Sequence, residues 1–143
     1  MFKGVIEVYW EITKKDQEDI QDSLKLDDFE VIRRFNPESY EPGMLHDAYC
    51  YRGADGCLVA FAAVQSGETF AEITRFYTLV KYRRTGLGKK FVQALLRLLN
   101  SNGVQEVGVE YFSAEGACFW FSLGFKPISE GSTRLVIQLN EHS

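Results

Sequence analysis

Apolar and polar residues alternate in several stretches of the chain, and a period of two is typical of strands that bury one face. The pattern predicts strands at residues 6–12, 47–52, 58–64, 70–79, 104–111 and 133–139. Asp55-Gly56 separates the second stretch from the third, and Asp-Gly between two apolar runs is a strong signal for a β-hairpin. Residues 47–79 are therefore expected to form an antiparallel meander of three strands.

Helical periodicity fills the gaps between these strands. Over residues 86–100, apolar side chains recur at spacings of three and four, which predicts a helix with one buried stripe. Residues 115–123 predict a short, aromatic-rich helix. Two more helices are expected after the first strand. One begins at a capping signal at Thr13, and the other is capped by Asp27 and ended by Pro37.

In chain order, the expected elements are a strand, two helices, three antiparallel strands, a helix, a strand, a helix and a strand. The strand–helix–strand unit within residues 70–111 should be parallel, with a right-handed crossover. The sequence therefore predicts an α/β fold of the α+β kind with one mixed sheet, in a single domain over residues 1–143.

The composition narrows the class of protein. Of the 143 residues, 45% are apolar and 25% are charged, as in ordinary soluble domains. The net charge of −4 disfavours nucleic acid as a partner and suits cationic substrates such as amines. Three cysteines without CxxC spacing and two histidines predict neither a disulfide framework nor a metal site. Without an apolar run of ~18 residues or a signal-peptide pattern, we expect a cytoplasmic protein with no membrane partner.

The segment 83–89, Arg-Arg-Thr-Gly-Leu-Gly-Lys, lies where a predicted strand gives way to a predicted helix. Such a junction points unpaired N–H groups and the positive end of the helix dipole at whatever lies ahead of it. Glycines there let a pyrophosphate approach the amides closely. A Walker loop would need Ser or Thr at Lys90, and a dinucleotide fingerprint would need Gly at Phe91. The alternative is a plain turn with solvated basic side chains.

This segment resembles motif A of the GNAT superfamily of acyltransferases, which reads Arg or Gln, two residues, Gly, one residue, then Gly or Ala. Arg83, Gly86 and Gly88 match that pattern. Residues 119–125, Phe-Trp-Phe-Ser-Leu-Gly-Phe, resemble the aromatic-x-x-Leu-Gly-Phe ending that is common in the family. The resemblance is specific over residues 70–125 and only topological before them, and it implies the GNAT-like acyl-CoA N-acyltransferase fold.

The resemblance also implies a co-substrate, acetyl-CoA. In the family, the pantetheine arm pairs with the backbone of the strand before motif A, and the pyrophosphate sits on the motif A amides. The cofactor-binding residues implied by position are Thr78, Arg83, Arg84, Thr85, Gly86, Leu87, Gly88, Lys89, Ser113 and Trp120. The last two depart from the family pattern, which often has Asn and Tyr at these places.

The expected chemistry is direct attack of an amine on the thioester, which needs a base, an oxyanion donor and a proton for the thiolate. Glu72 is the candidate base, because it stands eleven residues before Arg83, as the catalytic glutamate of histone-acetylating members does. Its alternatives are a solvent-facing side chain or a pair with Arg75. Tyr111 is the candidate acid, because an indole at Trp120 is not a practical proton donor. Its alternative is half-buried packing.

Two functions stay open. The first is an N-acetyltransferase that moves an acetyl group from acetyl-CoA to a primary amine of a small molecule or a protein. The second is a catalytically weak or inactive acyl-CoA-binding module that regulates a partner protein. A nucleic-acid binder using the basic residues 81–90 is disfavoured by the acidic total. The acceptor and the acyl length stay open, and exposed edge strands leave room for a homodimer.

Overall fold

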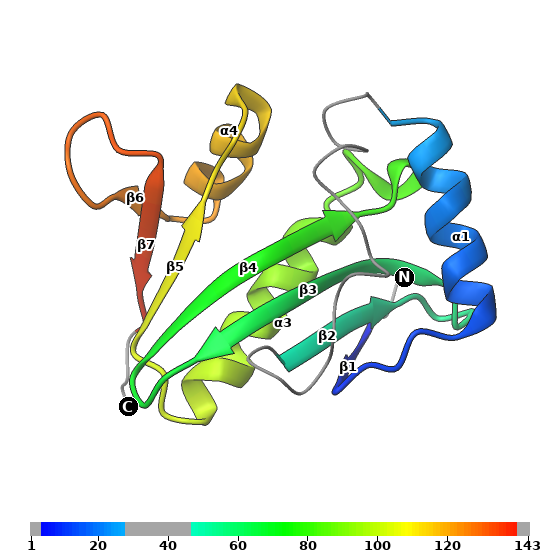
Figure 1. The fold of residues 1–143 in the computed structure, drawn as a ribbon. Coiled ribbons are helices and arrows are strands. Elements are labelled where there is room, and N and C mark those ends of the chain that lie inside the picture. Colours follow the sequence, from blue (N-terminus) through cyan, green and yellow to red (C-terminus); the bar gives the residue numbers. More distant parts are fainter. Residues whose placement is uncertain (1–3, 28–46, 140–143) are drawn as a thin grey trace.

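The computed structural model describes residues 4–27 and 47–139. Seven strands within these ranges form one mixed sheet in the order β1-β2-β3-β4-β5-β7-β6 (Figure 1). The strands are β1 (Val5–Val8), β2 (Asp47–Arg52), β3 (Leu58–Ser66), β4 (Phe70–Thr78), β5 (Glu106–Glu110), β6 (Lys126–Pro127) and β7 (Arg134–Gln138). The helices are α1 (Lys14–Lys25), the short 3-10 helix η2 (Val80–Tyr82), α3 (Leu87–Ser101) and α4 (Ala114–Ser122).

The strand pairing confirms the expected mixed sheet. β1 to β4 pair as antiparallel neighbours, which is the predicted meander with β1 added at its edge. The hairpin between β2 and β3 turns at Gly56, whose φ of +83° favours glycine. β4 and β5 are parallel, as a strand–helix–strand unit through α3 requires. β7 then pairs antiparallel with both β5 and β6.

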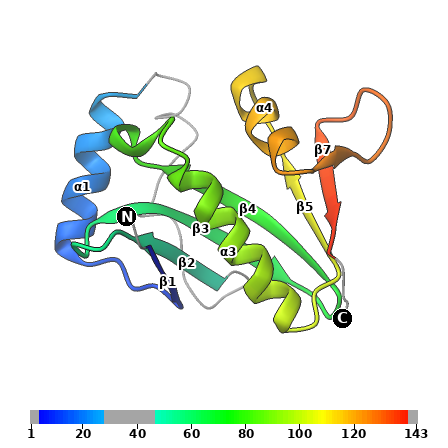
Figure 2. The same cartoon turned by 180° about the vertical axis from the view of Figure 1, so that it is seen from behind.

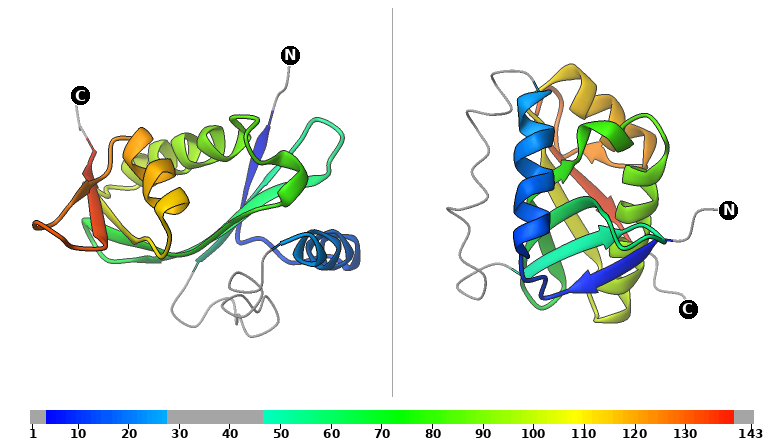
Figure 3. Two further views of the ribbon diagram at one scale, coloured as in Figure 1. Left: turned by 90° about the horizontal axis from the view of Figure 1, so that it is seen from above. Right: turned by 90° about the vertical axis from the view of Figure 1, so that its right-hand side faces the viewer.

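The helices cover both faces of the sheet. α3 and α4 lie on one face (Figure 2), and α1 lies on the other (Figure 3). The first face carries a core that includes Phe91 and Leu95 of α3 and Trp120 of α4. The second face carries a smaller core with Trp10 and Ile20. Both faces of the central strands are therefore buried, which accounts for the unbroken apolar run at Leu58–Val64 of β3.

The start of α1 is fixed by a buried carboxylate. Thr13 and Asp16 form a capping box, as the sequence predicted. The Asp16 carboxylate also accepts hydrogen bonds from Trp10 Nε1 at 3.0 Å and from two Arg52 nitrogens at 2.9 Å. Asp16 is only 1% exposed. One side chain thus joins the first turn of α1 to β2.

Several boundaries differ from the sequence prediction. The first strand ends at Val8 and not at residue 12, because Tyr9 adopts a φ of +51°, which breaks the extended backbone. Cys118 is exposed on α4, although its aromatic neighbours in the sequence favour a core position. The sequence pattern also missed η2 and the two-residue β6. The predicted second helix, after Asp27, lies outside the described residues.

None of the helices in the described part of the chain has the length and apolar character that crossing a bilayer requires. Within the same ranges, no three His, Cys, Asp or Glu side chains gather in a way that could hold a metal ion.

Candidate functional site

β4 and β5 pair only over the first part of β4. The parallel register runs from Phe70 opposite Glu106 to Ile73 opposite Val109. Beyond it the two strands diverge (Figure 1). β4 bulges at Thr74, where its register with β3 shifts, and a bulge bends and twists a strand. The second part of β4 is therefore paired with β3 on one edge, and its other edge has no strand partner among the described residues.

The free edge of β4 presents backbone hydrogen-bonding groups. Leu79 donates its N–H to Val59 of β3 at 3.0 Å. Because backbone groups alternate sides along a strand, Phe76 and Thr78 turn theirs away from β3. The Thr78 carbonyl accepts a hydrogen bond from Arg83 Nε at 2.9 Å. An extended ligand with amide groups can add to the remaining edge in the manner of an extra strand.

The turn between η2 and α3 gathers free amides. Arg84 and Gly86 both have positive φ, at +62° and +85°. The Leu87 amide donates to Thr85 Oγ1 at 3.3 Å. In the described structure, the amides without a hydrogen-bond acceptor in this segment are those of Arg84, Thr85, Gly86, Gly88 and Lys89. Consecutive free N–H groups at a helix N-terminus form an anion-binding concavity.

The two glycines of this turn serve different purposes. A Cβ at Gly86 would meet nothing within 4 Å, so the space before the turn is open, and the positive φ favours glycine. A Cβ at Gly88 would lie 3.0 Å from Thr78 Oγ1 and 3.5 Å from the Phe119 ring. Gly86 thus shapes the turn, whereas Gly88 lets α3 approach β4 closely.

The charges at the turn are unequally available. The Arg83 guanidinium forms an ion pair with Asp27, just after α1, with a nitrogen–oxygen distance of 2.7 Å. Its third nitrogen binds the Thr78 carbonyl. The Arg84 side chain is 88% exposed and has a 3.4 Å contact with Glu115, whose side chain is 79% exposed. Arg84 and the exposed Lys89 are therefore better placed than Arg83 to meet an anion.

Glu72 forms an ion pair across the sheet. Its β4 neighbours Ala71 and Ile73 belong to the core under α3, so Glu72 points to the opposite face. Both of its carboxylate oxygens accept hydrogen bonds from Arg134 of β7, one of them at 3.2 Å. Gly108 of β5 lies directly between β4 and β7 at this level and has no side chain to block the contact. The expected alternative partner, Arg75, does not form this pair.

Tyr111 follows β5 on the diverging side of the sheet. It is half-buried, and its ring packs edge-on against Phe121 with centroids 6.2 Å apart. Its backbone N–H donates to the Thr133 carbonyl at 3.1 Å. Glu72 and Tyr111 therefore belong to neighbouring segments, one before and one after the point at which β4 and β5 separate.

The two positions that depart from the family pattern have local structural roles. Ser113 caps α4 by accepting the Gly116 amide at 3.0 Å. Trp120 is 5% exposed and packs among three phenylalanine rings with centroids 5.0–5.2 Å away, those of Phe76, Phe119 and Phe125. Leu87 is likewise buried by its side chain, so at the turn it offers only its backbone.

Comparison with known protein families shows which family has this combination of turn and fold. The model of the acetyltransferase (GNAT) family matches residues 5–125, which covers both the turn and the aromatic ending of α4. The chain belongs to the GNAT family. The family match and the fold support an acyltransferase that binds acyl-CoA. No curated protein matches the chain in sequence.

Solved GNAT structures share the fold over nearly the whole chain. The ribosomal-protein-S18-alanine N-acetyltransferase from Escherichia coli is 16% identical, with a TM-score of 0.65 over 99% of this chain and 97% of its own. The PaiA N-acetyltransferase from Thermoplasma acidophilum, in complex with coenzyme A, is 17% identical, with a TM-score of 0.68 over 94% and 99%. Tetrahymena GCN5 is 10% identical, with a TM-score of 0.68 over 97% and 98%. At such identities the likeness concerns the fold.

Sequence reasoning missed two residues that the structure joins to the site. Asp27 was singled out only as the cap of a helix that lies outside the described residues, and the structure adds that its carboxylate holds Arg83. Arg134 was not singled out, yet it holds Glu72. Neither partner has a local signal, because each contact joins residues more than fifty positions apart.

Proposed function

We propose that this protein is an N-acetyltransferase that moves the acetyl group of acetyl-CoA to a primary amine by direct attack on the thioester. The observation that carries the proposal is the free edge of β4 leading directly to the open amides of residues 84–89. A pyrophosphate on those amides and a pantetheine arm along Phe76 and Thr78 would bring a thioester to the bulge at Thr74. Glu72 lies on β4 and Tyr111 directly after β5, both close in sequence to the residues at which these two strands separate.

In the proposed reaction, the residues of this chain have three tasks. Glu72 takes a proton from the acceptor ammonium, directly or through a water. A backbone N–H of β4 stabilises the oxyanion that forms as the amine nitrogen bonds to the carbonyl carbon. Tyr111 gives its proton to the thiolate as the carbon–sulfur bond breaks. Each assisted proton transfer contributes ~10²–10⁴-fold to the rate.

Two observations favour a second candidate, an acyl-CoA-binding module of little activity that regulates a partner protein. Glu72 is already engaged by Arg134, so its carboxylate is less free to act as a base. Trp120, at the usual tyrosine position, lies in the core, and its indole N–H is not a practical proton donor. Release of free thiol from acetyl-CoA across a panel of amines separates the two functions, since the module would bind CoA without turnover.

We further propose that residues 1–143 act as one domain in the cytoplasm, alone or as a homodimer, without a metal, a membrane or a nucleic acid. The acidic total charge supports the absence of nucleic acid. The acceptor is an amine of a small molecule or of a protein, and the same amine panel distinguishes these, because it includes peptide and polyamine acceptors.

CoA binding should raise the thermal stability of the protein. A ligand that binds only the folded state at 100 times its dissociation constant stabilises that state by ~2.7 kcal/mol. The measurement is a thermal melt with and without CoA, with adenosine as a control that lacks both pyrophosphate and pantetheine. An unchanged Tm at saturating CoA would contradict acyl-CoA binding, and both candidate functions would be lost with it.

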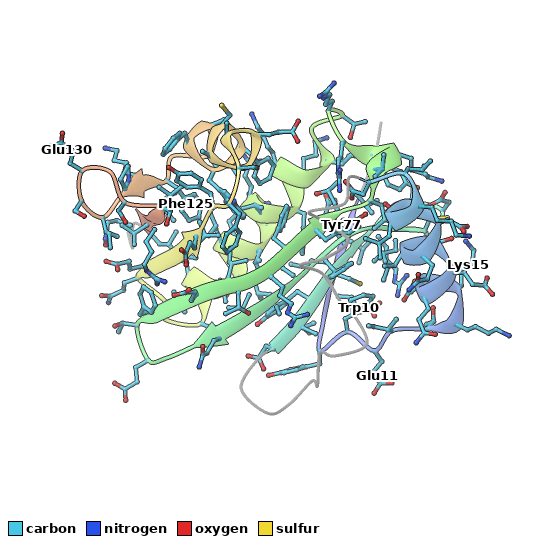
Figure 4. All side chains as sticks on the ribbon, turned by 45° about the horizontal axis from the view of Figure 1, so that its top comes forward. Trp10, Glu11, Lys15, Tyr77, Phe125 and Glu130 are labelled. Carbon is cyan, nitrogen blue, oxygen red and sulfur yellow. The ribbon has the colours of Figure 1, made fainter. Side chains whose placement is uncertain are left out.

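Gly86→Ala should weaken CoA binding by roughly tenfold or more, because the new methyl group enters the space before the amides. The matched control is Gly131→Ala. Gly131 has a similar φ of +79° and nothing within 4 Å of its Cβ, so both variants bear about the same backbone strain of ~1–2 kcal/mol. Gly131 neighbours Glu130, which lies at the far end of the molecule from Tyr77 (Figure 4). Calorimetric titration with CoA should distinguish the two variants, and equal affinities would argue against pyrophosphate at this turn.

A further inference from the structure

A partly buried polar cluster joins the end of α1 to the segment that precedes the open amides. Its members are Ser23 and Asp27 from α1 and its C-terminal turn, Tyr77 and Thr78 from β4, and Val80 and Arg83 from η2 and the following turn. Tyr77 stands near the end of β4, on the side of that strand where α1 lies (Figure 4). The Asp27 side chain is only 4% exposed.

The hydrogen bonds of this cluster have one consistent direction. Tyr77 Oη donates its single hydrogen to Asp27 Oδ2 at 2.8 Å. Ser23 Oγ, 2.7 Å from Tyr77 Oη, must then donate to it, because each hydroxyl has only one hydrogen. Ser23 Oγ in turn accepts the Val80 amide at 2.9 Å. The chain of donors runs from Val80 through Ser23 and Tyr77 and ends at Asp27.

Asp27 also receives both terminal nitrogens of Arg83. Nη1 binds Oδ1 at 2.9 Å and Nη2 binds Oδ2 at 2.7 Å, which is the bidentate geometry of strong Arg–carboxylate pairs. The Arg83 guanidinium lies 5.2 Å from the centroid of the Tyr77 ring, and its Nε binds the Thr78 carbonyl. All three guanidinium nitrogens donate hydrogen bonds within the protein, so the orientation of the Arg83 side chain is fixed and its charge is paired.

The charges of the cluster depend on one another. Burial by itself would lower the pKa of Arg83, but the hydrogen bond and charge of Asp27 raise it. Burial raises the pKa of Tyr77 to about 12, and the Asp27 carboxylate adds to that rise. Tyr77 therefore stays a donor at neutral pH. The Asp27 carboxylate thus accepts from both Tyr77 and Arg83, and its negative charge favours the protonated form of each.

Asp27 lies just after the end of α1. A carboxylate just after a helix C-terminus faces the negative end of the helix dipole, which is unfavourable. The hydrogen bonds described above reach it from β4 and from the turn after η2, 50 and 56 positions away along the chain. These two contacts therefore tie the Asp27 carboxylate to a segment that is distant in the sequence.

We propose that Asp27 is a positioning residue for CoA, which sets the distance between the free edge of β4 and the pyrophosphate-binding amides by holding Arg83. The cluster anchors the Thr78 carbonyl, the Val80 amide and the Arg83 side chain, and these three groups span the link between the two binding surfaces. One rigid link lets the arm and the pyrophosphate bind together, as the proposed function requires. Asp27 acts through Arg83 and does not touch CoA.

The test compares two ligands. Asp27→Asn keeps the shape of the side chain and removes its charge. We expect the dissociation constant for CoA to rise roughly 10- to 100-fold, which is the scale of a lost charge-assisted hydrogen bond. The dissociation constant for pantetheine, which lacks the pyrophosphate, should not change. Both are measured by calorimetric titration, with folding checked by circular dichroism.

Two further variants show whether the effect passes through Arg83. In an Arg83→Ala background, Asp27→Asn should cost little additional CoA affinity, because residues of one network do not act additively. Tyr77→Phe removes a single donor to Asp27, so it should weaken CoA binding in the same direction and by less. This variant keeps the test informative if Asp27→Asn folds poorly.

Asp16→Asn is the matched control, since it removes the carboxylate of a second Asp–Arg pair, at the opposite end of α1 from Asp27. It should leave the CoA affinity of the folded protein unchanged. The inference is overturned if Asp27→Asn binds CoA as the native protein does, or if pantetheine loses affinity by the same factor. If the native protein itself fails to bind CoA, the proposed function fails first and the inference falls with it.

Discussion

Glu72→Gln is expected to lower kcat by ~10²–10⁴-fold while the dissociation constant for CoA stays unchanged. Glutamine has the shape of glutamate and can hydrogen-bond Arg134, but it cannot take a proton from the acceptor. Because Glu72 lies on the face opposite α3 and beside the bulge, its loss should leave the amides of residues 84–89 intact. Steady-state kinetics with the best amine from the panel, together with CoA titration, give both numbers.

Glu106→Gln is the control for this substitution. Glu106 lies on β5, pairs opposite Phe70, and accepts a hydrogen bond from Gln138 at 2.6 Å, all at the end of the sheet away from the bulge. The kcat of the Glu106→Gln variant should equal that of the native protein. A Glu72→Gln protein with native kcat would remove this carboxylate from the mechanism and leave the CoA-binding module as the better account.

Asp16→Ala is expected to lower the free energy of unfolding by about 3–5 kcal/mol, the usual cost of removing one partner from a buried ion pair. The substitution leaves the Arg52 guanidinium and the Trp10 indole N–H without their acceptor and removes the reciprocal cap of α1. Urea unfolding followed by circular dichroism measures the change. Asp22→Ala, whose partner Lys25 and own carboxylate are both 76% exposed, should change the stability by less than about 1 kcal/mol.

The same carboxylate predicts how stability responds to acid. Burial by itself would raise the pKa of Asp16, but hydrogen bonds from Arg52, Trp10 and the Thr13 amide outweigh it and lower the pKa to about 2. Because the folded pKa lies below the unfolded value of 3.8, the contribution is complete above that value. It is then lost as the pH falls towards about 2. A native protein and an Asp16→Ala variant that lost stability equally over this range would contradict the assignment.

Local patterns in the sequence predicted most of the fold. The capping box at Thr13, the Asp55-Gly56 hairpin and the stripe of α3 each depend on residues close together in the chain, so their signals are readable. The end of the first strand before Tyr9 could not be predicted in this way. The positive φ of Tyr9 follows from the turn that carries Trp10 into the small core, and alternation alone continued the strand past it.

The candidate site also has parts that local sequence patterns predict and parts that they do not. The free amides follow from the glycine spacing of residues 83–89, which a sequence displays directly. The engagement of Arg83 by Asp27 and of Glu72 by Arg134 does not, because these partners are 56 and 62 positions apart. Charge at an arginine or a glutamate is visible in a sequence. Whether that charge is free for a ligand depends on the tertiary structure.

The division of the core by the sheet has a spectroscopic consequence. The chain has two tryptophans, and they lie in the two separate cores, Trp10 with α1 and Trp120 with α3 and α4. Trp10 is 3% exposed and Trp120 is 5% exposed. The Trp10 indole donates to the Asp16 carboxylate, whereas Trp120 is surrounded by phenylalanine rings, so the two fluorophores lie in different environments. Replacing one by phenylalanine leaves a fluorophore that reports on a single layer, and the optical signal of the protein can be resolved face by face.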